Sequence, residues 1–118
     1  MPTKEELTAF NSRLKKTKKQ YPQSSDRIDK IIDSLTTNPG QGERYPGFGE
    51  LEIRKLHIRL PEYKLGKSNG LRLIHLYIKE KNMVFPLTIY AKKGFGKEQN
   101  VLKQVRTAMK EVSTKLKP

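Results

Sequence analysis

Apolar residues near the start of the chain recur at the three- to four-residue spacing of an amphipathic helix. This stripe consists of Leu7, Phe10 and Leu14. Thr3 and Glu6 stand at the spacing of a capping box, which predicts that the helix begins near Thr3. Pro22 cannot continue a helix, so we expect the helix to end near Tyr21.

Two further segments have the same helical periodicity. One follows Ser24 or Ser25, either of which can cap its N-terminus, and ends at Asn38-Pro39-Gly40. Its apolar stripe is formed by Ile28, Ile31, Ile32 and Leu35. The other begins near Gly96 or Lys97 and runs toward the C-terminus. Its apolar side is formed by Val101, Val105, Ala108, Met109, Val112 and Leu116.

Three segments between these helices have strand patterns: 51–60, 71–78 and 84–91. In the first, apolar and basic residues alternate, with Leu56, Ile58 and Leu60 set against Lys55, His57 and Arg59. The second is dense in Leu, Ile and Tyr, which predicts that both of its faces are covered. Pro86 cannot donate to a strand ladder, so it indicates an edge position or a bulge.

The order of these elements predicts an α+β domain. Two N-terminal helices pack on a small antiparallel sheet, a three-strand meander, and a C-terminal helix follows. The length of 118 residues suits a single domain covering 1–118. The Gly- and Pro-rich segment Thr36–Glu50 has no periodic pattern, and it is either a functional loop or a surface connection.

The net charge of the chain limits the kinds of function that it could have. The 25 Lys and Arg against 12 Asp and Glu give +13, and residues 51–118, with 16 basic and 5 acidic side chains, carry +11 of it. Leu, Ile, Val and Phe make up about a quarter of the chain, above the ~20% at which disorder is expected. The sequence has neither a secretory signal nor an apolar run long enough to span a membrane. We therefore expect a cytoplasmic protein with a polyanionic partner and no membrane contact.

Several kinds of chemistry are excluded or disfavoured. The absence of cysteine excludes disulfides, thiolate zinc sites and Cys nucleophiles. Gly66-Lys67-Ser68 lacks the earlier glycine of a phosphate-binding loop and is followed by a strand instead of a helix. The two histidines have no carboxylate at metal-ligand spacing, so we expect neither a metal nor a cofactor. His75, inside an apolar strand, is expected to be a core residue, whereas His57 is either a solvated surface residue or a functional one.

Cations in the second half suit a phosphate backbone. Arg72 has apolar neighbours on both sides, and a buried or half-buried arginine usually has an anionic partner. A meander would gather several of the strand cations on one sheet face, which favours nucleic acid as the ligand. Because aromatic residues stack unpaired bases, RNA is favoured over duplex DNA. The available aromatics are Tyr45, Phe48, Tyr63, Tyr90 and Phe95.

At these residues the sequence resembles the RelE/ParE/HigB superfamily of toxins from prokaryotic type II toxin–antitoxin systems. The stretch Gly66-Lys67-Ser68-Asn69-Gly70-Leu71-Arg72-Leu73-Ile74 is similar to the family pattern Gly-Lys-Ser-Gly-Gly-Tyr-Arg-Val-Ile. Pro46-Gly47-Phe48-Gly49 and Arg54-Lys55-Leu56 resemble the approach to the family's second strand. Leu87-Thr88-Ile89-Tyr90-Ala91-Lys92 resembles its last strand.

The resemblance implies helices packed on a twisted antiparallel sheet, and a toxin that cleaves mRNA on the ribosome without a metal. Lys55 and His57 match basic or polar positions of the family's second strand, and Arg72 matches its core arginine. Tyr90 matches a tyrosine of the HigB-like branch, and Lys93 a basic position after the last strand. The implied catalytic set is Arg72, Tyr90, His57 and Lys93. The cations of the strands and of the loops between them add a predicted RNA-binding set: Lys55, Arg59, Lys64, Lys67 and Lys92.

The chain also departs from the family pattern. Family members usually open with a β-strand, whereas this chain is expected to enter a helix after a few residues, leaving a sheet edge exposed. Residues 96–118 contain no tyrosine, although some members use one in the final helix. Three hypotheses therefore stay open: an mRNA endonuclease, a non-enzymatic toxin of the ParE kind or a decayed one, and a plain RNA- or ribosome-binding module. The two toxin hypotheses imply a cognate antitoxin as partner.

Overall fold

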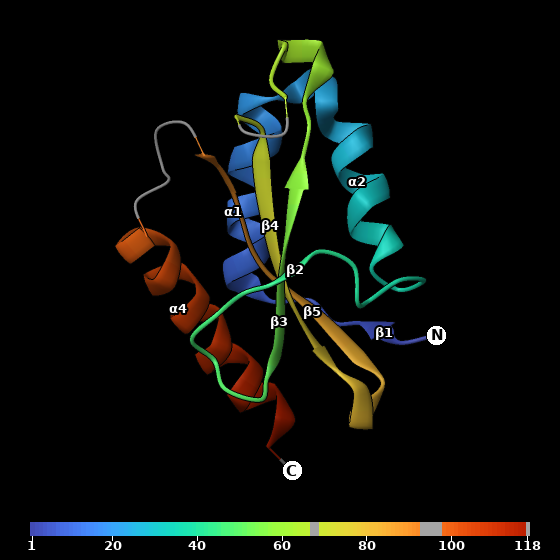
Figure 1. Ribbon diagram of the computed structural model, residues 1–118, viewed down its shortest axis with the longest axis vertical. Coiled ribbons are helices and arrows are strands. Elements are labelled where there is room, and N and C mark those ends of the chain that lie inside the picture. The colour runs from blue at the N-terminus through green and yellow to red at the C-terminus, as the bar shows by residue number, and fades with distance from the viewer. Residues whose placement is uncertain (67–68, 93–97, 118) are drawn as a thin grey trace.

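Among the residues that the structure describes, three α-helices and a five-stranded mixed sheet make up the fold (Figure 1). The computed structural model describes residues 1–66, 69–92 and 98–117, apart from the side chain of Glu98. The helices are α1 (Thr8–Gln20), α2 (Ser25–Ser34) and α4 (Glu98–Leu116). The strands are β1 (Thr3–Lys4), β2 (Glu43–Arg44), β3 (Glu52–Ile58), β4 (Leu71–Ile78) and β5 (Met83–Ala91). This arrangement confirms the predicted α+β class.

The three long strands form an antiparallel meander, as the sequence predicted. In the sheet they lie in the order β1-β5-β4-β3-β2, and only β1 runs parallel to its neighbour. Residues Lys79–Lys81 form a 3₁₀ turn between β4 and β5, and Asn82 completes the connection in the left-handed conformation with φ +54°. Opposite Pro86 the β4–β5 register shifts between Ile74 and His75, which confirms the bulge that the proline indicated.

The first residues are a strand, so the expected helix start near Thr3 is wrong. The backbone N–H of Thr3 donates to Asn82 O at 2.9 Å, and that of Glu5 donates to Val84 O at 2.9 Å. These bonds place Thr3–Lys4 in the sheet beside β5 and delay α1 until Thr8. The expected lack of a first strand is wrong for the same reason. Part of the outer edge of β5 is therefore paired.

The long Gly/Pro-rich segment also contributes to the sheet. Within it, Glu43 and Arg44 pair with Lys55 and Arg54 of β3. The three-strand expectation was therefore incomplete at both edges. A two-residue strand is too short to show periodicity, and its pairing depends on the neighbouring strand.

The second helix ends earlier than its flanking Asn-Pro-Gly sequence indicated. It stops at Ser34, and the hydroxyls of Thr36 and Thr37 donate to the carbonyls of Asp33 and Ser34. Short polar side chains that bond to nearby carbonyls favour turns over helix, which explains the early stop. At the other end Ser24 occupies the N-cap position, but the structure gives its side chain no capping hydrogen bond.

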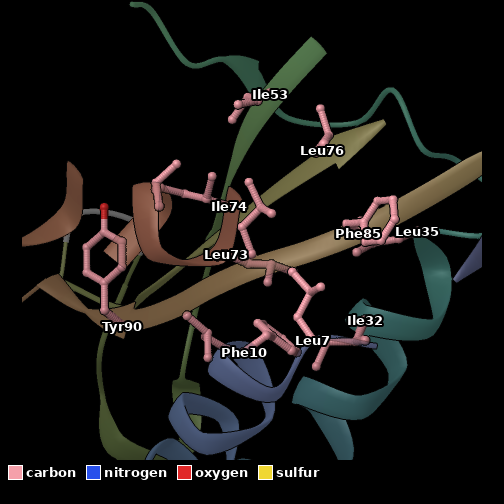
Figure 2. Close-up of a cluster of buried hydrophobic side chains, with 14 of the residues drawn as sticks. Leu7, Phe10, Ile32, Leu35, Ile53, Leu73, Ile74, Leu76, Phe85 and Tyr90 are labelled. Carbon is pink, nitrogen blue, oxygen red and sulfur yellow. The ribbon is translucent and has the colours of Figure 1, made fainter. Parts of the chain in front are cut away.

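Both faces of the central strands are covered. Every residue from Leu71 to Leu76 is buried, as the sequence predicted for this segment. Figure 2 shows Leu7, Phe10 and Ile32 on one side of β5, and Ile53, Ile74 and Leu76 on the other. Helix α4 packs against β5 and α1. It buries four residues of its predicted apolar side: Val101, Val105, Ala108 and Val112. In the part of the chain described, no helix is long and apolar enough to cross a membrane.

Candidate nucleic-acid interface

Three residues that the sequence proposed as catalytic form one row across the sheet. His57 of β3 stands opposite Arg72 of β4, and Arg72 stands opposite Tyr90 of β5. Residues directly opposite one another in a sheet present their side chains to the same face. The fold thus brings together a titratable imidazole, a cation and a phenol from three separate strands.

The bulge at Pro86 determines that Tyr90 belongs to this row. From the turn, the register runs from Ile78 opposite Met83 to His75 opposite Pro86. Continued without a shift, this register would put Ile89 opposite Arg72 and turn the tyrosine to the other face. The one-residue shift instead puts Tyr90 there. Pro86 cannot donate to the ladder, and it lies at the register shift that places Tyr90 opposite Arg72.

Exposure is highest at the β3 end of the row. His57 is half-buried, whereas Arg72 is 3% exposed and Tyr90 is 5% exposed. Figure 2 shows the Tyr90 ring on the same side of β5 as Ile74. Thr88, two residues before Tyr90, is buried too, and its hydroxyl has no hydrogen-bond partner among the described residues. Sequence reasoning missed Thr88, for which the only signal is a hydroxyl inside an apolar strand.

The environment of Arg72 is electrostatically unusual. Burial lowers the pKa of Arg72, and the nearby Tyr90 acts in the opposite direction. Nη1 of Arg72 donates to Leu71 O at 3.2 Å. An arginine remains protonated in proteins at neutral pH, so this guanidinium is a positive charge held beneath the sheet surface. A charge in a partly desolvated position acts more strongly on an anion than one in water.

Lys55 lies on the same face as His57, two residues earlier along β3. Its Nζ is 5.4 Å from the centre of the Tyr45 ring. Tyr45 in turn stacks against Phe48, with ring centres 5.8 Å apart and an angle of 25° between the planes. Lys55 is half-buried, and an aromatic pair lies beside it.

Two further predicted RNA-binding cations gather at one end of the sheet. Arg59 follows the end of β3 and is exposed. Lys92 follows β5, is exposed, and donates its backbone N–H to Gly70 O at 3.2 Å. Both therefore stand at the end where β4 begins. Lys64 is exposed in the β3–β4 connection, in the left-handed conformation with φ +56°. Lys67, Lys93 and Phe95 lie outside the described residues.

His75 is a core residue, as predicted. It is fully buried, and its Nε2 lies 2.8 Å from Pro39 O, so that nitrogen carries the proton. Burial lowers its pKa, and the charge of Arg54 lowers it further, while the Pro39 bond and Glu52 act against the shift. The neutral imidazole fastens the loop after α2 to β4, and its Nδ1 has no partner among the described residues.

Within residues 1–66, 69–92 and 98–117, no three His, Cys, Asp or Glu side chains cluster closely enough to hold a metal ion. A surface hollow of about 470 Å³ shares no residue with the row. It lies around the ion pair of Arg27 and Glu62, whose side-chain atoms approach to 2.9 Å. Its lining mixes both signs of charge, which does not suit a polyanion.

Comparison with known proteins identifies the fold. No family model and no curated protein matches the chain. A double mutant of the Escherichia coli toxin RelE, in the free state, matches with TM-score 0.58 and 17% identity over 90% of this chain and 96% of that one. The isolated RelE toxin of the same bacterium matches with TM-score 0.57 and 17% identity over 91% and 99%. The chain thus has a RelE-like fold, as its sequence motifs led us to expect.

Proposed function

We propose that this protein is the toxin of a toxin–antitoxin system, a cytoplasmic endonuclease that cleaves mRNA on the ribosome and inhibits translation. The observation that carries the proposal is the row of His57, Arg72 and Tyr90 on one face of a RelE-like sheet. Lys55 is on that face, and Arg59 and Lys92 stand at its end. A cationic face with an acid–base group is what RNA cleavage without a metal requires.

The chemistry uses the ribose 2′-OH as nucleophile. A base removes its proton, the 2′-oxygen attacks the neighbouring phosphorus, and the bond to the 5′-oxygen breaks as an acid protonates that oxygen. The products are a 2′,3′-cyclic phosphate and a 5′-hydroxyl. His57 is the more accessible acid–base group, because it is half-buried while Tyr90 is only 5% exposed. Tyr90 is the second acid–base candidate.

Arg72 stabilises the charge that develops on the phosphate in this scheme. Its guanidinium is held in a partly desolvated position, where electrostatic stabilisation of a transition state is strong. Lys55, Lys67 and Lys93 neutralise the flanking phosphates and hold the strand. Because Arg72 is 3% exposed, its contact with RNA requires the covering side chains to move when the substrate binds.

The burial of Arg72 and Tyr90 also favours one alternative, a non-enzymatic toxin of the ParE kind. In that case Arg72 and Tyr90 stabilise the sheet and never meet a substrate. The surface cations would then bind a protein or nucleic-acid target without cleaving it. Both toxin functions include a cognate antitoxin, for which an acidic or amphipathic segment is the complementary chemistry. Co-purification with the product of an adjacent small reading frame tests that partner.

Primer extension on programmed ribosomes separates these functions. The wild-type chain is expected to cut the messenger in the ribosomal A site. An Arg72→Ala, Tyr90→Phe double variant and a His57→Ala variant are expected to lose most cleavage while keeping their circular-dichroism spectra. Lys81→Ala, an exposed change in the β4–β5 turn, is the matched control. Full cleavage by the double variant contradicts the endonuclease assignment, and gyrase inhibition without cleavage supports the ParE-like alternative.

A further inference from the structure

The structure sorts the aromatic residues that could stack an RNA base. Tyr45 and Tyr90 are 4% and 5% exposed, so their rings are covered. Tyr63 is held edge-to-face by Tyr21, with ring centres 5.1 Å apart. Phe48 is half-buried like Tyr63, but it lies at the tip of the loop before β3 and stacks on the Tyr45 ring that Lys55 Nζ approaches. Its ring is therefore the best placed of the four to accept a base.

Phe48 rests on a fixed support. Its ring stacks on Tyr45 at 5.8 Å. Tyr45 extends the β2–β3 pairing, because its backbone N–H donates to Ile53 O at 2.7 Å. A ring supported in this way loses little conformational entropy when a second ring stacks on it. The support thus favours binding of a planar ligand.

The loop backbone holds Phe48 in this position. Gly47 and Gly49, on either side of it, have backbone φ angles of +98° and +59°, which residues other than glycine rarely adopt. Nη2 of Arg44 donates to Gly49 O at 3.4 Å and to Leu51 O at 3.3 Å. The backbone N–H of Leu51 donates to Phe48 O at 3.1 Å. The loop is therefore a closed turn that displays one aromatic ring.

We propose that Phe48 stacks a base of single-stranded RNA while Lys55 neutralises that nucleotide's phosphate. The inference rests on the proposed function, because it takes RNA as the ligand of the face that carries His57. Lys55 connects the two sites, since its Nζ lies over the Tyr45 ring that supports Phe48. Along β3, Lys55 and His57 are separated by about 7 Å, a distance that one nucleotide can span. Phe48 would thus position the nucleotide next to the scissile bond.

Stacking can be measured without cleavage. The probe is a short oligoribonucleotide, 2′-O-methylated throughout so that it cannot be cut, with 2-aminopurine as one base. The fluorescence of 2-aminopurine is quenched when the base stacks on an aromatic ring. The wild-type chain is expected to bind the probe and quench it. Phe48→Ala is expected to abolish quenching and weaken binding about 5- to 100-fold, because stacking of one base has that effect on affinity.

Two conservative variants separate stacking from folding. Phe48→Tyr keeps an aromatic ring and is expected to quench as the wild type does. Phe48→Leu keeps apolar contact with Tyr45 and is expected to lose the quenching although the chain folds. Leu51→Ala, at a residue 45% exposed in the same loop, is the matched control and is expected to leave quenching unchanged.

The outcomes distinguish this inference from the proposed function. Loss of quenching in Phe48→Leu, in a chain that cuts no messenger on ribosomes, supports the stacking site and contradicts the endonuclease. Equal quenching by wild type and Phe48→Leu overturns the stacking site even if the ribosome assay shows cleavage. A wild-type chain that neither binds nor quenches the probe also overturns it.

Discussion

The side-chain carboxylate of Glu111 in α4 accepts a hydrogen bond from the backbone N–H of Thr8 at 2.5 Å, at the start of α1. The other carboxylate oxygen accepts from the N–H of Ala9 at 3.1 Å. The N-cap residue Leu7 makes no side-chain cap, so a residue from the far end of the chain supplies it. An anion at a helix N-terminus also interacts favourably with the helix dipole. Helix α4 therefore supplies the N-terminal cap of α1.

Replacing Glu111 with Ala is expected to lower the free energy of unfolding by about 1–2 kcal/mol, because two helix N–H groups lose their acceptor. Guanidinium denaturation followed by circular dichroism measures the change. Glu80→Ala, in the exposed β4–β5 turn, is the matched control and is expected to change it by less than about 0.5 kcal/mol. Equal stability of Glu111→Ala and wild type would show that the cap contributes nothing.

The same contact gives an acid dependence. Partial burial alone would raise the pKa of Glu111, but the hydrogen bonds from Thr8 and Ala9 outweigh it and lower the pKa below its ordinary 4.5. The stabilisation is therefore present above pH 4.5 and is lost as the pH falls through the folded-state pKa. The stability difference between wild type and Glu111→Ala is expected to shrink below about pH 4.5. A difference that stays constant down to pH 3 contradicts this.

Stability is also expected to depend on the protonation of His75. Burial lowers the pKa of His75 in the folded chain, while the unfolded chain keeps a pKa near 6.5. Below pH 6.5 the unfolded state binds the proton first, so the free energy of unfolding falls as the pH is lowered from 6.5 toward the folded-state pKa. One proton gives a slope of at most about 1.4 kcal/mol per pH unit.

Denaturation between pH 7.5 and 5 measures this slope. His75→Leu is expected to flatten it, whatever its effect on stability at pH 7.5, because the titrating group is gone. Lys81→Ala, an exposed change in the β4–β5 turn that removes no histidine, is the matched control and is expected to keep the slope. If His75→Leu and wild type show the same slope, His75 does not govern stability in this range.

Sequence periodicity predicted the elements that bury a whole face. Apolar residues recur at helical spacing because each turn of a helix must cover the same core. Ile28 in α2 and Val105 in α4 are examples, and both are fully buried. The strand β1 was not predictable, because two residues carry no period. Thr3 and Glu6 matched a helix-capping pattern, yet pairing with β5 placed Thr3 and Lys4 in a strand. Tertiary contacts overrode local preference there.

The sequence proposed the residues of the candidate site but could not give their arrangement. Alternation in β3 indicated that Lys55 and His57 share a face, and the sheet bears this out. The row with Arg72 and Tyr90 depends on strand register, which pairing fixes and single-strand patterns do not. Pro86 indicated a bulge, but only the observed shift shows that the bulge determines which face Tyr90 joins.

Gly70 is expected to tolerate no side chain, because β3 passes close to it. A Cβ added at Gly70 would lie 2.0 Å from Ile58 O and 3.0 Å from Gly66 O. Gly70→Ala must therefore push the end of β3 away from β4, next to the pairing of His57 with Arg72. We expect a loss of about 2–3 kcal/mol in the free energy of unfolding, as for other overpacked sites.

Urea denaturation checks this, and Gly66→Ala is the matched control. A Cβ at Gly66 meets no atom within 4 Å, so that variant is expected to stay within about 0.5 kcal/mol of wild type. The strand pairing beside the site makes a second readout useful, since RNA binding should weaken in Gly70→Ala and not in Gly66→Ala. Equal stability of the two variants would mean that the β3–β4 approach is not close in solution.

Lys55 is expected to act through its charge on an RNA phosphate. Affinity for a single strand falls with salt concentration, with a logarithmic slope of about 0.7 for each phosphate neutralised. Lys55→Ala is therefore expected to weaken RNA binding and reduce this slope by about 0.7. Lys81→Ala, at the opposite end of the β4–β5 hairpin from Arg72, is expected to leave the slope unchanged. Fluorescence-anisotropy titrations between about 50 and 200 mM salt measure both slopes. If Lys55→Ala weakens binding but keeps the wild-type slope, Lys55 acts by supporting the Tyr45 ring and not by meeting a phosphate.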